Sequence, residues 1–321
     1  MKLIRSLIKQ AFYSLVFTLF LTGNSFAGKT IHESQQSDLY SVGRDYIPNG
    51  KGDGIDASAR GLKEAPANGP FSNTGISYHN GPIMTGTTNV YYIWYGNWTN
   101  NTATTILTDL MRSFTGSPLF NTNTTYYDKT GTRVMNSVNF VQSISDNYSL
   151  GSSLTDANVA TIVQNAILNG SLPKDTKGVY FVLTSADVKE TSGFGSKYCG
   201  WHTYGTLAGS NIKYSFVGDA STQAPSGCIA LTASTAPNGN LGADGMASVI
   251  FHELSEAVTD PNLNAWYDSR GAENADKCAW VFGTKYTTST GKTANVRLGA
   301  RDYLIQQNWV NAGKGYCSLS Y

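Results

Sequence analysis

The hydrophobic pattern first indicates strands that are apolar on both faces. Residues 89–98, with the sequence NVYYIWYGNW, form a β-branched and aromatic run, and residues 178–184, GVYFVLT, form a second one. Short continuous runs of this kind are typical of strands buried inside a sheet that is covered on both sides. Residues 212–217 predict a further short strand. We therefore expect a sheet with the two long runs near its centre.

Helical patterns alternate with these strands. Residues 101–114 and residues 154–169 carry apolar side chains at helical spacing, and Thr155 or Asp156 is a suitable N-cap for the second segment. Residues 119–150 alternate polar and apolar positions and predict a pair of strands. The order strand, helix, strands, helix, strand predicts an α/β (α+β) fold, a single domain with a mixed central sheet flanked by helices.

A third helical pattern begins at Met246 and ends before Pro261, because proline cannot continue a helix. This helix contains most of the candidate chemistry. His252 and Glu256 are four residues apart, so they lie on the same face of the helix. Glu253 follows His252 directly. A histidine and two carboxylates on a largely apolar helix are costly to bury without partners.

This segment resembles the zincin signature H-E-x-x-H, in which two histidines bind zinc and the glutamate is the general base. Glu256 replaces the second histidine here, and a carboxylate oxygen is also a zinc ligand. The pattern predicts that His252 and Glu256 bind Zn²⁺ and that Glu253 is the catalytic base. H-E-x-x-E also occurs by chance in helices, and the alternative is a helix cap or a buried hydrogen-bond network.

The third metal ligand has to come from elsewhere in the chain. Asp276, twenty residues past Glu256, and Glu273 are the candidates, and Glu273 is alternatively a residue that orients His252. His202 is a further, less favoured candidate. One histidine with two carboxylates makes a site more negative than neutral ligands do, so a bound water would be less acidic. A structural or Ca²⁺-like ion is therefore an alternative to a catalytic one.

Composition narrows the class of protein. Charged residues make up 14% and aromatic residues 12% of the 321 residues, and the formal net charge is +1. These values favour a compact, loop-rich protein and exclude a disordered chain or a coiled coil. Since there is no basic excess, we expect no nucleic-acid partner.

The first 27 residues have the pattern of a secretory signal peptide. Lys2, Arg5 and Lys9 precede an apolar run over residues 11–21, and Ser25-Phe26-Ala27 fits a cleavage site. Removing these three positive charges changes the net charge from +1 to −2. The apolar run is too short for a membrane anchor, and no other stretch is long and apolar enough to span a bilayer. The sequence predicts a secreted, extracellular protein.

The remaining chain is expected to have a polar N-terminal segment and one domain. Residues 28–73 lack sustained periodicity and predict a flexible segment or an extended arm packed on the domain, which comprises residues 74–321. An even number of cysteines in a secreted protein favours two disulfides with three possible pairings, of which we favour the two local ones. The local pairings are Cys199–Cys228 and Cys278–Cys317.

Several ordered blocks between residues 78 and 317 resemble the phosphate-induced/EXORDIUM family, best known as secreted plant cell-wall proteins. The blocks are Tyr78-His79-Asn80-Gly81-Pro82, Ile93-Trp94-Tyr95-Gly96, Cys199-Gly200-Trp201-His202, Pro237-Asn238-Gly239, His252-Glu253-Leu254-Ser255-Glu256, Asn264-Ala265-Trp266-Tyr267, and Glu273, Asp276 and Cys278. The resemblance implies secretion and a single fold over this range. It implies no particular reaction.

Two functional hypotheses follow. The first is a zinc-dependent, peptidase-like hydrolase that acts on an extracellular polypeptide. The second is a non-catalytic binding protein for cell-wall glycan or a surface partner, in which the histidine–glutamate cluster is structural. Trp266 and Tyr267 follow the third helix on a predicted loop and are the candidate substrate-binding residues. An open metal position in a cleft would distinguish the hydrolase from the binding protein.

Overall fold

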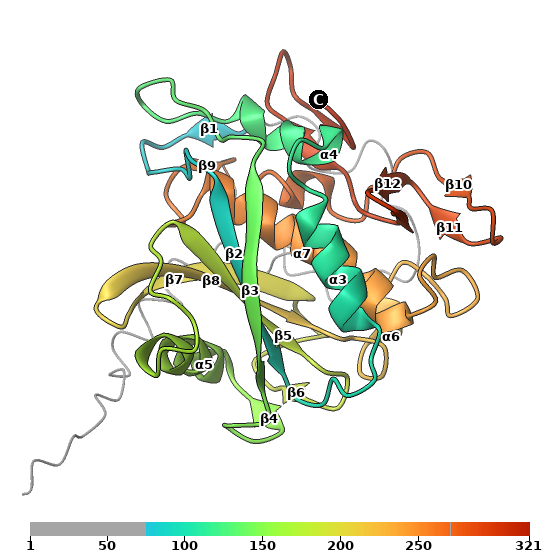
Figure 1. The fold of residues 1–321 in the computed structure, drawn as a ribbon. Coiled ribbons are helices and arrows are strands. Elements are labelled where there is room, and N and C mark those ends of the chain that lie inside the picture. Colours follow the sequence, from blue (N-terminus) through green and yellow to red (C-terminus); the bar gives the residue numbers. More distant parts are fainter. Residues whose placement is uncertain (1–74, 270) are drawn as a thin grey trace, which may run out of the picture.

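The computed structural model describes residues 75–321 except residue 270. The predicted signal peptide and the segment 28–73 lie outside the described residues. A five-stranded sheet with the order β3-β2-β5-β8-β7 lies at the centre (Figure 1). Its strands are β2 (Thr88–Tyr95), β3 (Val138–Asp146), β5 (Gly178–Thr184), β7 (Gly200–Leu207) and β8 (Ser210–Gly218). Only β7 runs antiparallel to its neighbour, so the sheet is mixed, as predicted.

Helices cover both faces of this sheet (Figure 1). They are α3 (Ala103–Arg112) and α7 (Leu241–Thr259) on one face and α5 (Asp156–Leu168) on the other. Side chains of β2 alternate between the two cores: Tyr92 and Trp94 pack with α3 and α7, whereas Tyr91 and Ile93 pack with α5. This double burial explains why the β2 sequence is apolar without alternation. The predicted mixed α+β architecture is confirmed.

The helix boundaries follow from local capping. The Thr155 side chain accepts a hydrogen bond from the backbone N–H of Asn158 at the start of α5, as predicted for that N-cap. Helix α7 begins earlier than the sequence predicts, because the Asn240 side chain caps it by accepting from the backbone N–H of Ala243 at 3.0 Å. A Cβ atom at Gly242 would lie 2.2 Å from Asp219 Oδ1. The glycine therefore permits a close approach inside the helix instead of ending it.

One sequence prediction about the sheet is wrong, and one of its strands was not predicted. Residues 119–150 contribute only β3 to it, since α4 (Pro118–Asn121) and the 3-10 helix η1 (Thr122–Thr125) occupy the first part. The predicted strand at residues 212–217 is part of β8, and β8 forms a long hairpin with β7, which was not predicted. The sequence does not predict β7 because its small and polar residues weaken the apolar pattern, although Trp201 is buried on one face and His202 on the other.

Short two-stranded pairs and helical turns complete the domain. They are β1 (Ser77–Tyr78) with β9 (Trp266–Tyr267), β4 (Ser153–Leu154) with β6 (Lys189–Glu190), β10 (Tyr286–Thr287) with β11 (Thr293–Ala294), β12 (Val296–Leu298) with β13 (Arg301–Tyr303), β14 (Asn308–Val310) with β15 (Tyr316–Ser318), and the turns α6 (Pro225–Cys228) and η2 (Asp276–Cys278). In Figure 1, β1 and β9 lie at one end of the molecule and β10, β11 and β12 lie on the far side of α3 and α7, whereas β4 and β6 lie at the opposite end from β1.

The structure contains both disulfides that the local pairing predicts. Cys199, just before β7, bonds to Cys228 at the end of α6, and Cys278 of η2 bonds to Cys317 of β15. Disulfides persist in oxidising compartments, so both bonds are compatible with an extracellular protein. Among the helices in the part of the chain that the structure describes, none has the length and apolarity needed to cross a membrane.

Candidate metal centre

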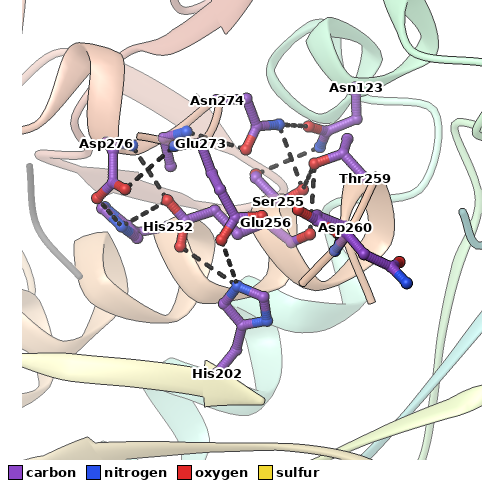
Figure 2. Close-up of polar contacts among 12 residues, drawn as sticks. Asn123, His202, His252, Ser255, Glu256, Thr259, Asp260, Glu273, Asn274 and Asp276 are labelled. Carbon is purple, nitrogen blue, oxygen red and sulfur yellow. Dashed lines mark hydrogen bonds and ion pairs between the residues drawn. The ribbon is translucent and has the colours of Figure 1, made fainter. Parts of the chain in front are cut away.

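A cluster of buried histidines and carboxylates lies beside α7 (Figure 2). Helix α7 contributes His252 and Glu256, the edge strand β7 contributes His202, and the segment after α7 contributes Glu273 and Asp276. Each of these residues is at most 2% exposed. The structure thus brings together all five residues that the sequence proposes as metal ligands, including the less favoured His202.

Glu256 and His252 form the first half of the cluster with Asp276. His252 Nε2 lies 3.0 Å from Glu256 Oε1 and 3.5 Å from Asp276 Oδ1. The backbone N–H of Asp276 donates to the same Glu256 oxygen at 3.1 Å. The Glu273 N–H in turn donates to Asp276 Oδ2 at 3.1 Å. These backbone contacts fix the segment after α7 against the helix.

The other oxygen of Glu256 faces the second half of the cluster. His202 Nε2 lies 3.6 Å from Glu256 Oε2 and 3.1 Å from Glu273 Oε2 (Figure 2). Glu256 is therefore shared between two groups of three, one around each histidine. In each group, the histidine comes from a regular element of the fold and one carboxylate comes from the segment after α7.

Both groups have the donor chemistry and spacing of a metal site. Two ligand atoms bound to one tetrahedral zinc ion at about 2.1 Å lie about 3.4 Å apart. The distances in the two groups range from 3.0 to 3.6 Å. An imidazole with carboxylates suits Zn²⁺ or a similar transition metal better than Ca²⁺ or Mg²⁺, which prefer oxygen ligands. A His/Glu/Asp group in this cluster could hold a metal ion.

The carboxylates control the charge of the helix histidine. Burial alone would lower the pKa of His252, but the negative charges of Glu256, Asp276 and Glu253 outweigh burial and raise this pKa well above its usual range. The cluster therefore attracts positive charge strongly enough to hold a proton where no cation is bound.

Glu253 belongs to neither group of three. It lines a small cavity together with His252, Asp244, Ser248 and Gln306. The cavity has a volume of about 20 Å³, which is room for about one water molecule. The catalytic residue proposed from the sequence thus lies next to a space of the right size for a reacting water.

Close packing brings Glu253 toward β7. A Cβ atom at Gly200 would lie 2.9 Å from Glu253 Oε1 and 2.5 Å from Val249 Cγ1. Any side chain at residue 200 would therefore push α7 away from the strand. The glycine sets the distance between the helix that carries His252 and the strand that carries His202.

An amide network supports the segment that carries Glu273 and Asp276. Asn274 Nδ2 donates to Asn123 Oδ1 at 3.0 Å, and Asn308 Nδ2 donates to the same oxygen at 2.8 Å. Asn123 Nδ2 donates to Ser255 Oγ of α7 at 3.3 Å (Figure 2). Sequence analysis missed these residues, because single amides in distant loops have no motif.

A buried ion pair anchors the same segment. Lys277 Nζ lies 3.0 Å from Asp268 Oδ2, and both side chains are fully buried. The Asp268 carboxylate also accepts the backbone N–H of Ala272 at 3.0 Å. The position of Lys277 between Asp276 and Cys278 is a sequence signal that this lysine belongs to the same segment. Its partner Asp268 could not be predicted from residue spacing.

The expectation that Trp266 offers an exposed aromatic face is wrong. Trp266 is 3% exposed, and its indole N–H donates to the backbone oxygen of Tyr127 at 2.8 Å. The predicted loop is strand β9, which pairs with β1 and buries the ring between Tyr78 and Tyr126. Tyr267 is half-buried and stacks on His79 with 3.6 Å between the ring centroids.

Fold and site together define a mixed α+β protein with a buried histidine–carboxylate cluster that could hold a metal ion. Residues 76–308 match the family model of the phosphate-induced protein 1 conserved region. The chain therefore belongs to this phosphate-induced/EXORDIUM family, as its sequence blocks indicate.

Curated relatives agree with this assignment. Protein EXORDIUM-like 3 of Arabidopsis thaliana is 32% identical over 280 residues, which cover 76% of this chain and 82% of the relative. Protein EXORDIUM of the same plant is 30% identical, with coverage of 71% and 80%. Protein PHOSPHATE-INDUCED 1 of Nicotiana tabacum is 26% identical, with coverage of 65% and 74%. The comparison with solved structures gave no match.

Proposed function

We propose that the chain is a secreted, zinc-dependent hydrolase of the peptidase kind, with His252, Glu256 and Asp276 as the metal ligands. The observation that carries the proposal is the arrangement of one helical turn of α7. That turn places two ligand side chains in a buried cluster and places Glu253 at a cavity of about 20 Å³ that His252 also lines. Asp276 completes the ligand set from the following segment.

The residues have separate roles in this proposal. A bound Zn²⁺ supplies a Lewis acid that polarises a carbonyl group and makes a water more acidic. Glu253 accepts the proton of the attacking water in the cavity beside it and later returns a proton to the leaving amine. The backbone N–H of Asp276, 3.1 Å from Glu256 Oε1, holds that carboxylate in place.

Secretion is part of the proposal. The signal-peptide pattern of residues 1–27 supports export, and the two disulfides fit an oxidising compartment. An extracellular polypeptide is then the substrate class to test first.

The size of the cavity favours a second candidate function. Pockets that bind drug-sized ligands have volumes of about 300–1,000 Å³, whereas this cavity has about 20 Å³. Peptide hydrolysis therefore requires the lining residues to move apart. Without such a movement, a metal ion would tie α7 to the segment around Asp276, and the protein would be a non-catalytic binder of cell-wall glycan or a surface partner.

Metal content and activity together test these two functions. We expect zinc in the purified wild-type protein. His252→Ala should lose the zinc ion that His252, Glu256 and Asp276 bind. Glu253→Gln should keep the wild-type zinc content and lose hydrolysis of a peptide library. A folded wild type that takes up no metal after zinc is supplied would rule out the hydrolase. Zinc binding with no peptide cleavage, in contrast, would favour the binding protein.

A further inference from the structure

We propose that the cluster holds two divalent cations, with His252 and Asp276 on one, His202 and Glu273 on the other, and the Glu256 carboxylate bridging them. This inference rests on the proposed metal site and extends it. The proposed hydrolase needs only the first ion, so the second is a separate claim about this chain.

The two oxygens of Glu256 face different histidines. Oε1 lies 3.0 Å from His252 Nε2, and Oε2 lies 3.6 Å from His202 Nε2. A carboxylate that offers one oxygen to each side is arranged to bridge two ions. Ions in two-metal sites are separated by about 3.5–4 Å, a span that one carboxylate can bridge.

The second group is complete without the H-E-x-x-E pattern. His202 comes from β7, and Glu273 comes from the segment after β9, so two independent parts of the fold converge on Glu256 Oε2. Each group then has one imidazole, one carboxylate of its own and a share of Glu256. A single-ion site would leave the contact of 3.1 Å between His202 and Glu273 without a role in binding.

The balance of buried charge also favours two ions. Four carboxylates lie at or beside the cluster, and each is at most 2% exposed; they are Glu253, Glu256, Glu273 and Asp276. Negative charges that are buried close together repel one another strongly, and divalent cations between them reduce this cost. Two divalent cations with neutral imidazoles would balance four negative charges, whereas one would leave two of them. The neighbouring Lys277 is paired with Asp268 at 3.0 Å.

Metal counting with matched variants tests this proposal. The mature protein is stripped with a chelator, reloaded with Zn²⁺, desalted and analysed by mass spectrometry of the metal. We expect two zinc ions per wild-type chain and one in His202→Ala. His79→Ala is the matched control, since His79 stacks on Tyr267 outside the cluster, and it should keep two ions.

A second readout does not depend on the variants. X-ray absorption of the zinc-loaded wild type should show a metal–metal vector at about 3.5–4 Å, and this vector should be missing from folded His202→Ala. One ion per wild-type chain without the vector would overturn the second site and leave the proposed hydrolase intact. No bound ion would overturn both proposals. Two ions in folded His202→Ala would overturn the assignment of His202.

Discussion

Trp201 and His202 are neighbours in β7, and their side chains point into two different clusters of buried acidic residues. Trp201 points to the face that α5 covers, and His202 points to the face that α7 covers. On the α5 side, the indole N–H of Trp201 donates to Asp156 Oδ1 at 2.9 Å. On the α7 side, His202 Nε2 lies 3.1 Å from Glu273 Oε2. On one face of β7 a carboxylate therefore meets a neutral donor, and on the other face a different carboxylate meets an imidazole.

The acids on the α5 side are satisfied by neutral donors. The Tyr198 hydroxyl lies 2.9 Å from Asp156 Oδ1, and the backbone N–H groups of Ser192 and Gly193 donate to the Glu190 carboxylate at 2.8 and 3.2 Å. Hydrogen bonds of this kind stabilise a carboxylate without a cation. This cluster accounts for the path of the chain into β7 and has the properties of a structural network.

The acids on the α7 side face histidines instead. Glu256, Glu273 and Asp276 each approach an imidazole nitrogen at 3.0 to 3.6 Å. Imidazole nitrogens and carboxylate oxygens bind the same metals, so this arrangement favours a cation. The comparison teaches that burial of acids alone does not indicate a metal site; the chemistry of the opposing groups does.

Removal of the metal ion by a chelator should give the largest difference in stability effect between the two clusters. A ligand present at about a thousand times its dissociation constant stabilises the folded state by about 4 kcal/mol. Removing the ion should then lower the melting temperature by about 10 °C for a domain of this size, because the α7 cluster loses its compensating charge. Thermal unfolding of the zinc-loaded protein, with and without a chelator, measures this shift.

The control for chelation lies on the α5 side. Glu190→Gln weakens the hydrogen bonds that neutral donors make on the α5 side. It should therefore lower the melting temperature by the same amount with and without zinc. His252→Ala should instead abolish most of the zinc-dependent shift. An equal zinc-dependent shift in wild type and in His252→Ala would show that the ion binds elsewhere.

Gly200→Ala should damage the α7 side through packing. The new Cβ atom would lie 2.5 Å from Val249 Cγ1 and 2.9 Å from the backbone oxygen of Phe216. Overpacking of this kind typically costs about 1–3 kcal/mol, and we expect a value near the upper end because a backbone atom is involved. Denaturant unfolding measures the loss. Gly86→Ala is the control, since nothing lies within 4 Å of its Cβ position; equal stabilities of the two variants would contradict the prediction.

The hydrophobic periodicity of the sequence predicted the helices and strands that surround the two clusters. The apolar runs of β2 and β5 and the capped helix α5 each have a local signal, and the order of these elements predicts the mixed sheet. The H-E-x-x-E spacing likewise places His252 and Glu256 on one face of α7, because both residues belong to one element.

The sequence could not predict how distant elements meet. The position of His202 depends on β7, whose glycine and threonine residues hide its strand pattern. The amide network depends on the contact of Asn123 with Ser255, which are 132 residues apart. Trp266 is buried because β1 pairs with β9 and because Tyr126 and Tyr127 pack against its ring. Each of these features is set by tertiary packing and not by local spacing.

Trp201→Phe tests the α5 side alone. Asp156 would lose the indole N–H that donates to it at 2.9 Å, and it would keep the Tyr198 hydroxyl. Removing one donor from a buried acid costs about 1–3 kcal/mol, and we expect about 2 kcal/mol. Zinc content should not change, because His202 points to the other face. Denaturant unfolding and metal analysis measure both quantities, and a loss of zinc would show that the two clusters are coupled through β7.

The smallest effect concerns Asp244, an acid that lies on α7 but has neutral donors. Asn238 donates to it through the backbone N–H at 2.9 Å and through Nδ2 at 2.7 Å. Burial is the main cause that raises the pKa of Asp244 to about 6.

Because the folded-state pKa is higher than the unfolded-state value of about 4, the folded state binds the proton more tightly. This contribution to stability is full below about pH 4 and is lost as the pH rises to about 6. The hydrogen bonds and Arg301 oppose the effect of burial and are already included in this pKa. We expect a loss of roughly 1–2 kcal/mol across this window. Denaturant unfolding of the metal-free protein between pH 4 and 7 should show this slope in the wild type and a smaller slope in Asp244→Asn. Equal slopes would mean that Asp244 is ionised normally, and that its neutral donors compensate its burial.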